Sequence, residues 1–367
     1  MPRHCSPCRA VRGFTLIEML IVVAIAVILM AIALPTVKYA LDDAKIREGS
    51  RQVNAQVAVA KALAASTRRG AGLVFLVKRV PSPNPSDPPG TFVPLATDIY
   101  LAKDPPPYAG GIATSRIQTN FVMGSGFQLI FVDASNIDSM TGPQPDDLSR
   151  IMLAQMTNPN EQISIQFDFK GHVYSAIRDG NTNVNQTQFY INDAIVPPVG
   201  YPIHQASGKP FGSKYQIFRG PQAEGKPLKL PPGTALDLVY SGTGPGGNEL
   251  SAANSYVRLM FSPSGEIRDI HYDYLDMNSN LQDATIGQLT ALHLLLGRVD
   301  KVGLPLFGPA GPSDTNNLSD QTTLWVSIGR RSGSVRTTEN LHDGSGGATA
   351  LSSSRKNAVQ GQMMGGQ

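Results

Sequence analysis

Cysteine is almost absent from this 367-residue chain, in which Cys5 and Cys8 are the only two. A structural zinc site needs four ligands, and no second C-x-x-C pair follows the first, so we interpret the pair as incidental to the amino-terminal segment. The rest of the chain has no disulfide to stabilise it and must bury a core of its own. Hydrophobic residues make up 41% of the sequence, which is enough for such a core.

Acidic residues are absent from the first thirteen positions, which contain Arg3, Arg9 and Arg12. Without these arginines the chain has 28 basic and 28 acidic residues, so the formal net charge of +3 is a property of the amino terminus. Bulk binding of nucleic acid depends on a positive excess that neutralises phosphates. We therefore predict no nucleic-acid partner.

Recognisable catalytic motifs are absent as well. The sequence has no G-x-S-x-G and no H-E-x-x-H, and its six histidines have no obvious set of partners. Residues 220–226 (GPQAEGK) fit the phosphate-loop pattern, but Pro227 and the prolines at 231 and 232 forbid the helix that such a loop requires. We predict no catalytic residue, no cofactor and no enzymatic activity.

Charge is nearly absent from residues 14–34, a run of 21 residues (FTLIEMLIVVAIAVILMAIAL) whose single charged side chain is Glu18. As a helix this run would be about 31 Å long at about 1.5 Å per residue, which matches the hydrocarbon core of a bilayer. We predict a transmembrane helix over residues 14–35. The preceding arginines predict a cytoplasmic amino terminus and an outward-facing chain beyond Pro35.

Three interpretations of this segment compete. Residues 31–33 (AIA) resemble a signal-peptide cleavage site, after which a secreted product would begin at Leu34, and a plain signal anchor is the second interpretation. Glu18 favours a third, an assembling subunit, because a carboxylate in a membrane helix costs about 2.5–3.5 kcal/mol and only a partner in a neighbour would offset that cost. Residues 36–69 favour it too, since they contain no proline and continue as an amphipathic helix. Its apolar positions are Val53, Val57, Ala60 and Leu63/Ala64.

Residues 12–18 (RGFTLIE) resemble the cleavage and methylation motif of type IV prepilins, a family that includes type IV pilins and the pseudopilins of type II secretion. The resemblance implies that a prepilin peptidase cuts after Gly13 and that Phe14 becomes the N-methylated first residue. It also implies that Glu18 pairs with the amino group of an adjacent subunit during assembly. Pro35 matches the proline that often kinks the family's helix.

A weaker resemblance extends along the chain. A helix end and first strand over residues 60–76, a strand reversal over 261–267 and a late strand over 324–330 follow an order similar to that of H-type minor pseudopilins. K-type tip subunits characteristically lack the glutamate, so Glu18 argues against that assignment. The family's implied partners are a prepilin peptidase, other pilin-like subunits and an inner-membrane assembly platform.

The predicted fold is α+β, with a long amino-terminal helix packed on an antiparallel β-rich head. The predicted segments are a cleaved leader (1–13), a transmembrane helix (14–35), its amphipathic continuation (36–69), a β-rich head (70–336) and a disordered tail (337–367). Within the head, alternation predicts hairpins over 163–177 and 256–274, and short helices are predicted over 148–156 and 286–296.

Two groups of acidic residues could in principle bind a cation. Asp269, His271 and Asp273 alternate on one strand and so share a face, but a solvated outer face explains the same pattern. Four further aspartates, which could offer oxygen ligands to calcium, lack EF-hand spacing, and a turn rich in Asp and Asn is the preferred interpretation. These are Asp133, Asp138, Asp146 and Asp147. We predict no metal site.

The predicted function is structural. The subunit would wait in the inner membrane as a single-pass protein with a periplasmic head, and then join a pseudopilus or a cell-surface fibre. A minor pilin for adhesion or DNA uptake is the runner-up in the same class. The alternative from another class is an exported or anchored periplasmic binding protein or enzyme with no fibre role.

Overall fold

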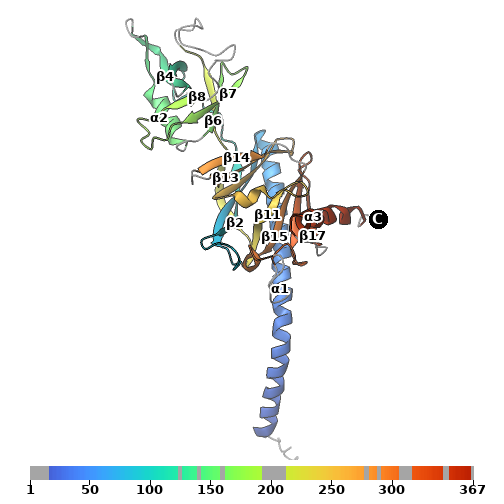
Figure 1. The fold of residues 1–367 in the computed structure, drawn as a ribbon. Helices are drawn as coiled ribbons and strands as arrows, with labels where there is room; N and C mark the ends of the chain where they lie inside the picture. The colour runs from blue at the N-terminus through green and yellow to red at the C-terminus, as the bar shows by residue number, and fades with distance from the viewer. Residues whose placement is uncertain are drawn as a thin grey trace, which may run out of the picture.

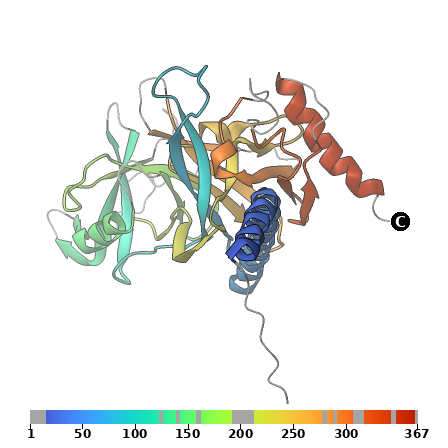
Figure 2. The ribbon, with the colours of Figure 1, turned by 90° about the horizontal axis from the view of Figure 1, so that it is seen from below.

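The computed structural model describes residues 16–122, 126–138, 142–157, 162–191, 212–276, 281–286, 291–305, 316–341 and 347–364. The fold is α+β, as predicted, with one long amino-terminal helix and a large antiparallel β-rich body. Helix α1 (Leu16–Thr67) emerges from the body as a stalk, and a second, smaller sheet lies at the opposite end of the molecule (Figure 1). Seen along α1, this smaller sheet and the carboxy-terminal helix lie on different sides of the helix (Figure 2).

The large sheet has ten strands within the described residues. They run in the order β14-β13-β12-β1-β2-β11-β15-β16-β17, and β10 lies along the edge of β2 that β11 also uses. Each pairing is antiparallel. The strands are β1 (Ala71–Pro81), β2 (Phe92–Lys103), β10 (Gln222–Lys229), β11 (Thr234–Thr243), β12 (Tyr256–Phe261), β13 (Ile267–Leu275), β14 (Leu281–Ile286), β15 (Ala291–Arg298), β16 (Leu324–Gly329) and β17 (Val335–Glu339).

Both faces of the large sheet are covered around β15 and β16. Because side chains alternate along a strand, Leu294 and Val326 face the core formed with α1. Leu295 and Trp325 face the other way and pack against helix α3 (Gly347–Met364). Short 3-10 turns η1 (Glu249–Ala252) and η2 (Val299–Lys301) follow β11 and β15. Strands β15 and β16 are therefore buried between α1 and α3.

A smaller module is inserted between β2 and β10. Within the described residues it is a seven-stranded antiparallel sheet with its own core, centred on Ile117, Phe131, Ile165 and Tyr215. Its elements are β3 (Ser115–Val122), β4 (Gly126–Asp138), β5 (Gly142–Pro145), α2 (Asp147–Gln155), β6 (Gln162–Phe167), β7 (Val173–Arg178), β8 (Phe189–Ile191) and β9 (Tyr215–Phe218).

The local predictions are confirmed where alternation was clear. Strands β6 and β7 form the predicted hairpin over 163–177, β12 and β13 form the one over 256–274, and α2 covers the helix expected at 148–156. Residues 220–226 belong to extended structure at the start of β10, without the helix of a phosphate loop.

Two local predictions are wrong. Within the helix expected over 286–296, Ile286 ends β14 and residues 291–296 belong to β15, while residues 287–290 lie outside the described residues. The leucines of β15 fill both faces of a doubly covered strand. The tail expected to be disordered over 337–367 contains the end of β17 and helix α3. This helix forms because Ala350, Leu351 and Ala358 pack against Trp325 and Leu295.

Candidate functional site

Over residues 16–31, α1 presents apolar side chains on all sides, and Glu18 is its one charged residue there. Before residue 32, twelve large apolar side chains of its described part are at least half exposed. They are Leu16, Ile17, Met19, Leu20, Ile21, Val22, Val23, Ile25, Val27, Ile28, Leu29 and Met30. A helix that is apolar on all sides is normally buried in a bundle or a membrane.

This apolar surface is large enough that its exposure to water is strongly unfavourable. Burying the exposed half of each side chain is worth about 1 kcal/mol or more, so the twelve together amount to on the order of 15 kcal/mol. A whole domain is stable by only about 5–15 kcal/mol. Left in water, such a segment would drive association, so we expect another apolar phase or other helices to cover it.

Glu18 interrupts this surface in the first turn of α1. Its side chain is exposed, and a carboxylate in a first turn interacts favourably with the positive end of the helix dipole. The predicted cleavage and methylation residues, Gly13 and Phe14, lie outside the described residues. Their roles and that of Glu18 remain predictions.

Position 35 lies inside α1, which the structure describes as one helix from Leu16 to Thr67. Proline has no amide hydrogen, so one hydrogen bond of the helix is missing there. The kink at Pro35 stays a prediction. Across the described residues, we find no helix with an apolar stretch long enough to cross a membrane.

The second half of α1 is fixed rigidly to the large sheet. The predicted apolar stripe is confirmed at Val53, Val57, Ala60 and Ala64, each with 0% exposure. Gly49 allows close approach, because a Cβ atom there would lie 3.1 Å from a methyl carbon of Leu296. The exposed apolar segment is thus one continuous helix with a well-anchored base.

Polar contacts secure the same face of α1. Lys61 donates through Nζ to the carbonyl oxygens of Ser332 and Gly333, both at 3.0 Å, in the turn after β16. Asn54 donates through Nδ2 to Oγ1 of Thr337 on β17 at 2.9 Å. These contacts join the β16–β17 edge of the sheet to the helix.

The structure does not bring Asp269, His271 and Asp273 together as one group of ligands. Asp273 turns inward and accepts hydrogen bonds from the backbone amides of Ser255 (2.7 Å) and Tyr256 (2.9 Å). His271 lies 3.2 Å from Asp269 through Nε2. Among the described residues, no group of three or more His, Cys, Asp or Glu side chains is arranged to hold a metal.

His271 forms an ion cluster with carboxylates on both sides. Nδ1 is 3.7 Å from Asp283 of β14 and within hydrogen-bonding distance of the hydroxyl of Thr285 (2.9 Å). Partial burial lowers its pKa, but hydrogen bonds to Asp269 and Asp283 outweigh burial and raise the pKa to about 9. This arrangement links β13 to β14 electrostatically.

Three of the four aspartates considered as calcium ligands have separate local partners. Asp146 caps α2 by accepting from the amide of Ser149 at 3.0 Å, and Asp147 pairs with Arg150 at 2.9 Å. Asp133 accepts from the amide and hydroxyl of Ser135. These contacts are those of an N-cap, a surface ion pair and an Asx turn.

Two other features were not predicted from the sequence. The inserted module depends on pairing between segments far apart in the chain, and α3 lies in a stretch with few apolar residues. A cluster of His293, Trp325 and Arg355 joins α3 to the sheet. The lone tryptophan was the one signal in the sequence that could have pointed to this cluster.

A comparison with known protein families finds a match in the apolar amino-terminal segment. A family model described as a prokaryotic N-terminal methylation motif matches residues 8–34. The chain therefore carries the prepilin-type signal, and the resemblance of residues 12–18 is confirmed. No curated protein and no solved structure matches the chain.

Proposed function

We propose, from an amino terminus that carries the methylation motif of type IV prepilin-like proteins, that this chain is a structural subunit of a pilin-like fibre. The observation that carries the proposal is the exposed apolar surface of α1 within the residues that match that motif. The subunit has no enzymatic role in this proposal. Its role is to form the fibre, which is held together by apolar contacts between neighbouring helices.

Before assembly, α1 anchors the precursor in the inner membrane in a single pass, with the body in the periplasm. The support is the apolar run over residues 14–34 and the arginines that precede it. A prepilin peptidase then removes residues 1–13 after Gly13, and Phe14 is methylated. An inner-membrane assembly platform receives the processed subunit.

During assembly, the same helix moves from lipid into a bundle of helices from neighbouring subunits. Glu18 pairs there with the amino group of Phe14 in the adjacent subunit. In that low-dielectric interior a carboxylate without a counter-charge is costly, so the pair sets the axial register of the helices. Pro35 adjusts the direction of the helix between the bundle and the body.

The inserted module lies at the end of the molecule away from the apolar half of α1 (Figure 1). In a fibre with the helices at its centre, this module is the outermost part of the subunit. We therefore assign contacts with the fibre's partners to the module, and packing in the fibre to α1.

Within the class, we favour a pseudopilin of type II secretion, with a resemblance to H-type minor subunits. A minor pilin of an adhesion or DNA-uptake system is the other assignment. The balance of 28 basic and 28 acidic residues outside the leader gives no support for bulk DNA binding.

The test is the amino terminus of the mature protein. Expressed with a prepilin peptidase, the chain should yield a product that begins with N-methylated Phe14, identified by mass spectrometry of its amino-terminal peptide. The Gly13→Leu variant is the control and should keep the leader. A product that begins at Leu34 would instead mean ordinary secretion, and the fibre function would be refuted.

A further inference from the structure

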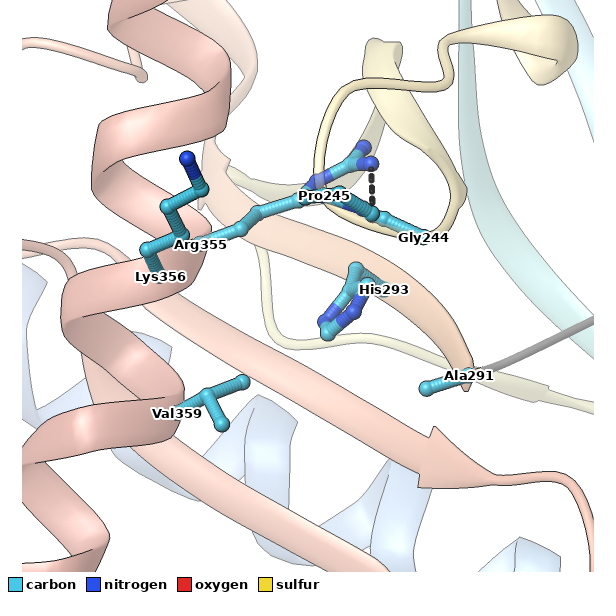
Figure 3. A pocket seen from close by; sticks show the side chains of 7 residues that line it. All are labelled: Gly244, Pro245, Ala291, His293, Arg355, Lys356 and Val359. Atoms are coloured by element: carbon cyan, nitrogen blue, oxygen red, sulfur yellow. Dashed lines mark hydrogen bonds between the residues drawn. The ribbon is translucent and has the colours of Figure 1, made fainter.

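A cavity of about 430 Å³ lies between α3 and the ends of β11 and β15 (Figure 3). This volume is in the range of small-molecule sites, which is about 300–1,000 Å³. Its apolar lining comes from Pro245, Ala291 and Val359. Its polar lining comes from His293, Arg355 and Lys356.

Arg355 brings a buried positive charge to this cavity. Its side chain is 1% exposed and extends from α3 to donate to the carbonyl oxygens of Gly244 (2.8 Å) and Tyr240 (2.7 Å). The guanidinium carbon lies 5.1 Å from the centre of the Trp325 ring. Burial lowers the pKa of Arg355 to about 10, so it remains charged at neutral pH.

This charge has no direct carboxylate partner. Among the described residues Arg355 forms no ion pair, and its Nε has no hydrogen-bond partner. Glu249 acts on it at longer range, but the carboxylate of Glu249 already accepts from the amide (3.0 Å) and hydroxyl (2.8 Å) of Thr243. Buried cations are normally paired, so an anion beside Arg355 would be stabilised.

His293 supplies a neutral polar group on the wall opposite α3. The ring is 4% exposed, and its Nδ1 lies 2.8 Å from the hydroxyl of Ser327. Burial and the charge of Arg355 lower its pKa to about 4, so the ring is neutral at pH 7. In the tautomer in which the Ser327 hydroxyl donates to Nδ1, Nε2 carries the hydrogen and is the ring's remaining donor; the proposed site uses this tautomer.

Lys356 adds a second positive charge at the rim. It is exposed, lies next to Arg355 on α3, and has no ion pair within the part of the chain that the structure describes. Val359, one turn further along α3, is 44% exposed and forms part of the apolar wall. Both positive charges and Val359 thus come from the same helix, while Pro245 and Ala291 complete the apolar lining from outside it.

We infer that this cavity binds a small organic carboxylate with an apolar body. The carboxylate accepts from Nε2 of His293 and lies in the field of Arg355 and Lys356. The apolar body packs against Val359, Ala291 and Pro245. A cationic ligand is repelled by the two positive charges, and a strongly hydrated dianion does not suit the apolar wall. This site is independent of fibre assembly.

The test uses the full chain in detergent micelles, with hexanoate as the probe. Trp325 is the only tryptophan of the chain, and its ring centre lies 6.3 Å from that of His293, so its fluorescence reports on the cavity. We expect a saturable change in Trp325 emission with hexanoate. Hexanamide and hexylamine, which keep the apolar body without the negative charge, should bind at least tenfold more weakly.

Two variants at exposed positions locate the site without disturbing the core. Val359→Phe should fill the cavity and weaken hexanoate binding at least tenfold, and Lys356→Gln should weaken it severalfold. The matched control is Leu148→Phe on α2, which is 54% exposed and lies in the inserted module. It should leave binding unchanged.

The inference is overturned if hexanoate gives no saturable signal, if hexanamide binds equally well, or if Val359→Phe has no effect. A free acid and the carboxyl terminus of a peptide share the chemistry of the probe. A capped tripeptide ending in leucine distinguishes them: a larger affinity than that of hexanoate identifies a peptide terminus as the ligand, and a smaller one identifies a free acid.

Discussion

Asp237 is a fully buried aspartate in the large sheet, and we expect it to make stability depend on pH. It lies on β11 with 0% exposure. Its carboxylate accepts from Nδ2 of Asn317 at 2.9 Å and from the amide of Val239 at 3.0 Å. Among the described residues it has no ion pair. Burial outweighs these hydrogen bonds and raises its pKa from 3.8 to about 6.

The sign follows from proton binding in the two states. Between about pH 4 and pH 6 the folded chain holds the Asp237 proton more tightly than the unfolded chain, so stability falls as pH rises. The difference in pKa corresponds to about 3 kcal/mol, lost progressively across this range and constant above it. Replacing Asp237 with Asn removes the titration.

The assay is urea unfolding of the full chain in detergent, followed by Trp325 fluorescence from pH 4 to pH 7.5. Trp325 is the only tryptophan and lies in the large sheet, so the fluorescence reports unfolding of that sheet. The inserted module contains no tryptophan and contributes no signal of its own. Other titrations cancel in the difference between wild type and Asp237→Asn if the sites are independent. That difference should move by about 2.5 kcal/mol in favour of the variant from pH 4 to pH 7.5, because part of the total already lies below pH 4.

Asp237→Leu provides a second measurement of the same titration. It leaves Nδ2 of Asn317 without this acceptor, so it should shift the free energy of unfolding by a different constant amount. Its pH-dependent part should equal that of Asp237→Asn. A difference that stays flat between pH 4 and pH 7 for both variants would show that burial does not raise the pKa of Asp237.

Three further predictions concern α1 and the β13–β14 edge. Glu18→Ala should still be processed by the peptidase but should enter fibres poorly, measured by the fraction of subunit in sheared fibres; normal incorporation would refute the pairing role. Val57→Ala should destabilise the chain by about 2 kcal/mol in urea unfolding followed by Trp325, while Val59→Ala, at a 48% exposed position of the same helix, should change it by less than about 0.5 kcal/mol. Because the pKa of His271 is raised to about 9, its contribution to stability is complete below pH 6.5 and is lost as pH rises through 9. His271→Gln should remove this loss, and an unchanged pH profile of unfolding would contradict the ion cluster.

The sequence was sufficient for elements that carry a clear period. The buried stripe of α1 follows from apolar residues three and four positions apart, and the β6–β7 hairpin follows from strict alternation. The sequence was not sufficient for β15, whose run ALHLLLG reads equally well as helix. A strand that is covered on both faces has no polar alternation, so only its tertiary surroundings decide between the two.

One of the candidate sites could be predicted from the sequence, and the other could not. Residues 12–18 could be interpreted from the sequence because processing enzymes recognise a short contiguous motif. The cavity beside α3 could not, since His293 and Arg355 meet only after strands and helix have packed. Helix α3 itself is rich in small and polar residues, and a few apolar contacts to Trp325 and Leu295 hold it. Intrinsic preference gives little sign of such a helix.

The way the inserted module joins the large sheet has a consequence for how this protein could change over time. The chain leaves the sheet at Lys103 and returns at Gln222, and these two residues are paired partners on adjacent antiparallel strands. A tight reverse turn is all that would be needed to close the gap after removal of residues 104–221. Residues 104–221 are therefore separable from the rest of the fold, and a lineage could acquire, lose or replace them while the large sheet and α1 stayed intact.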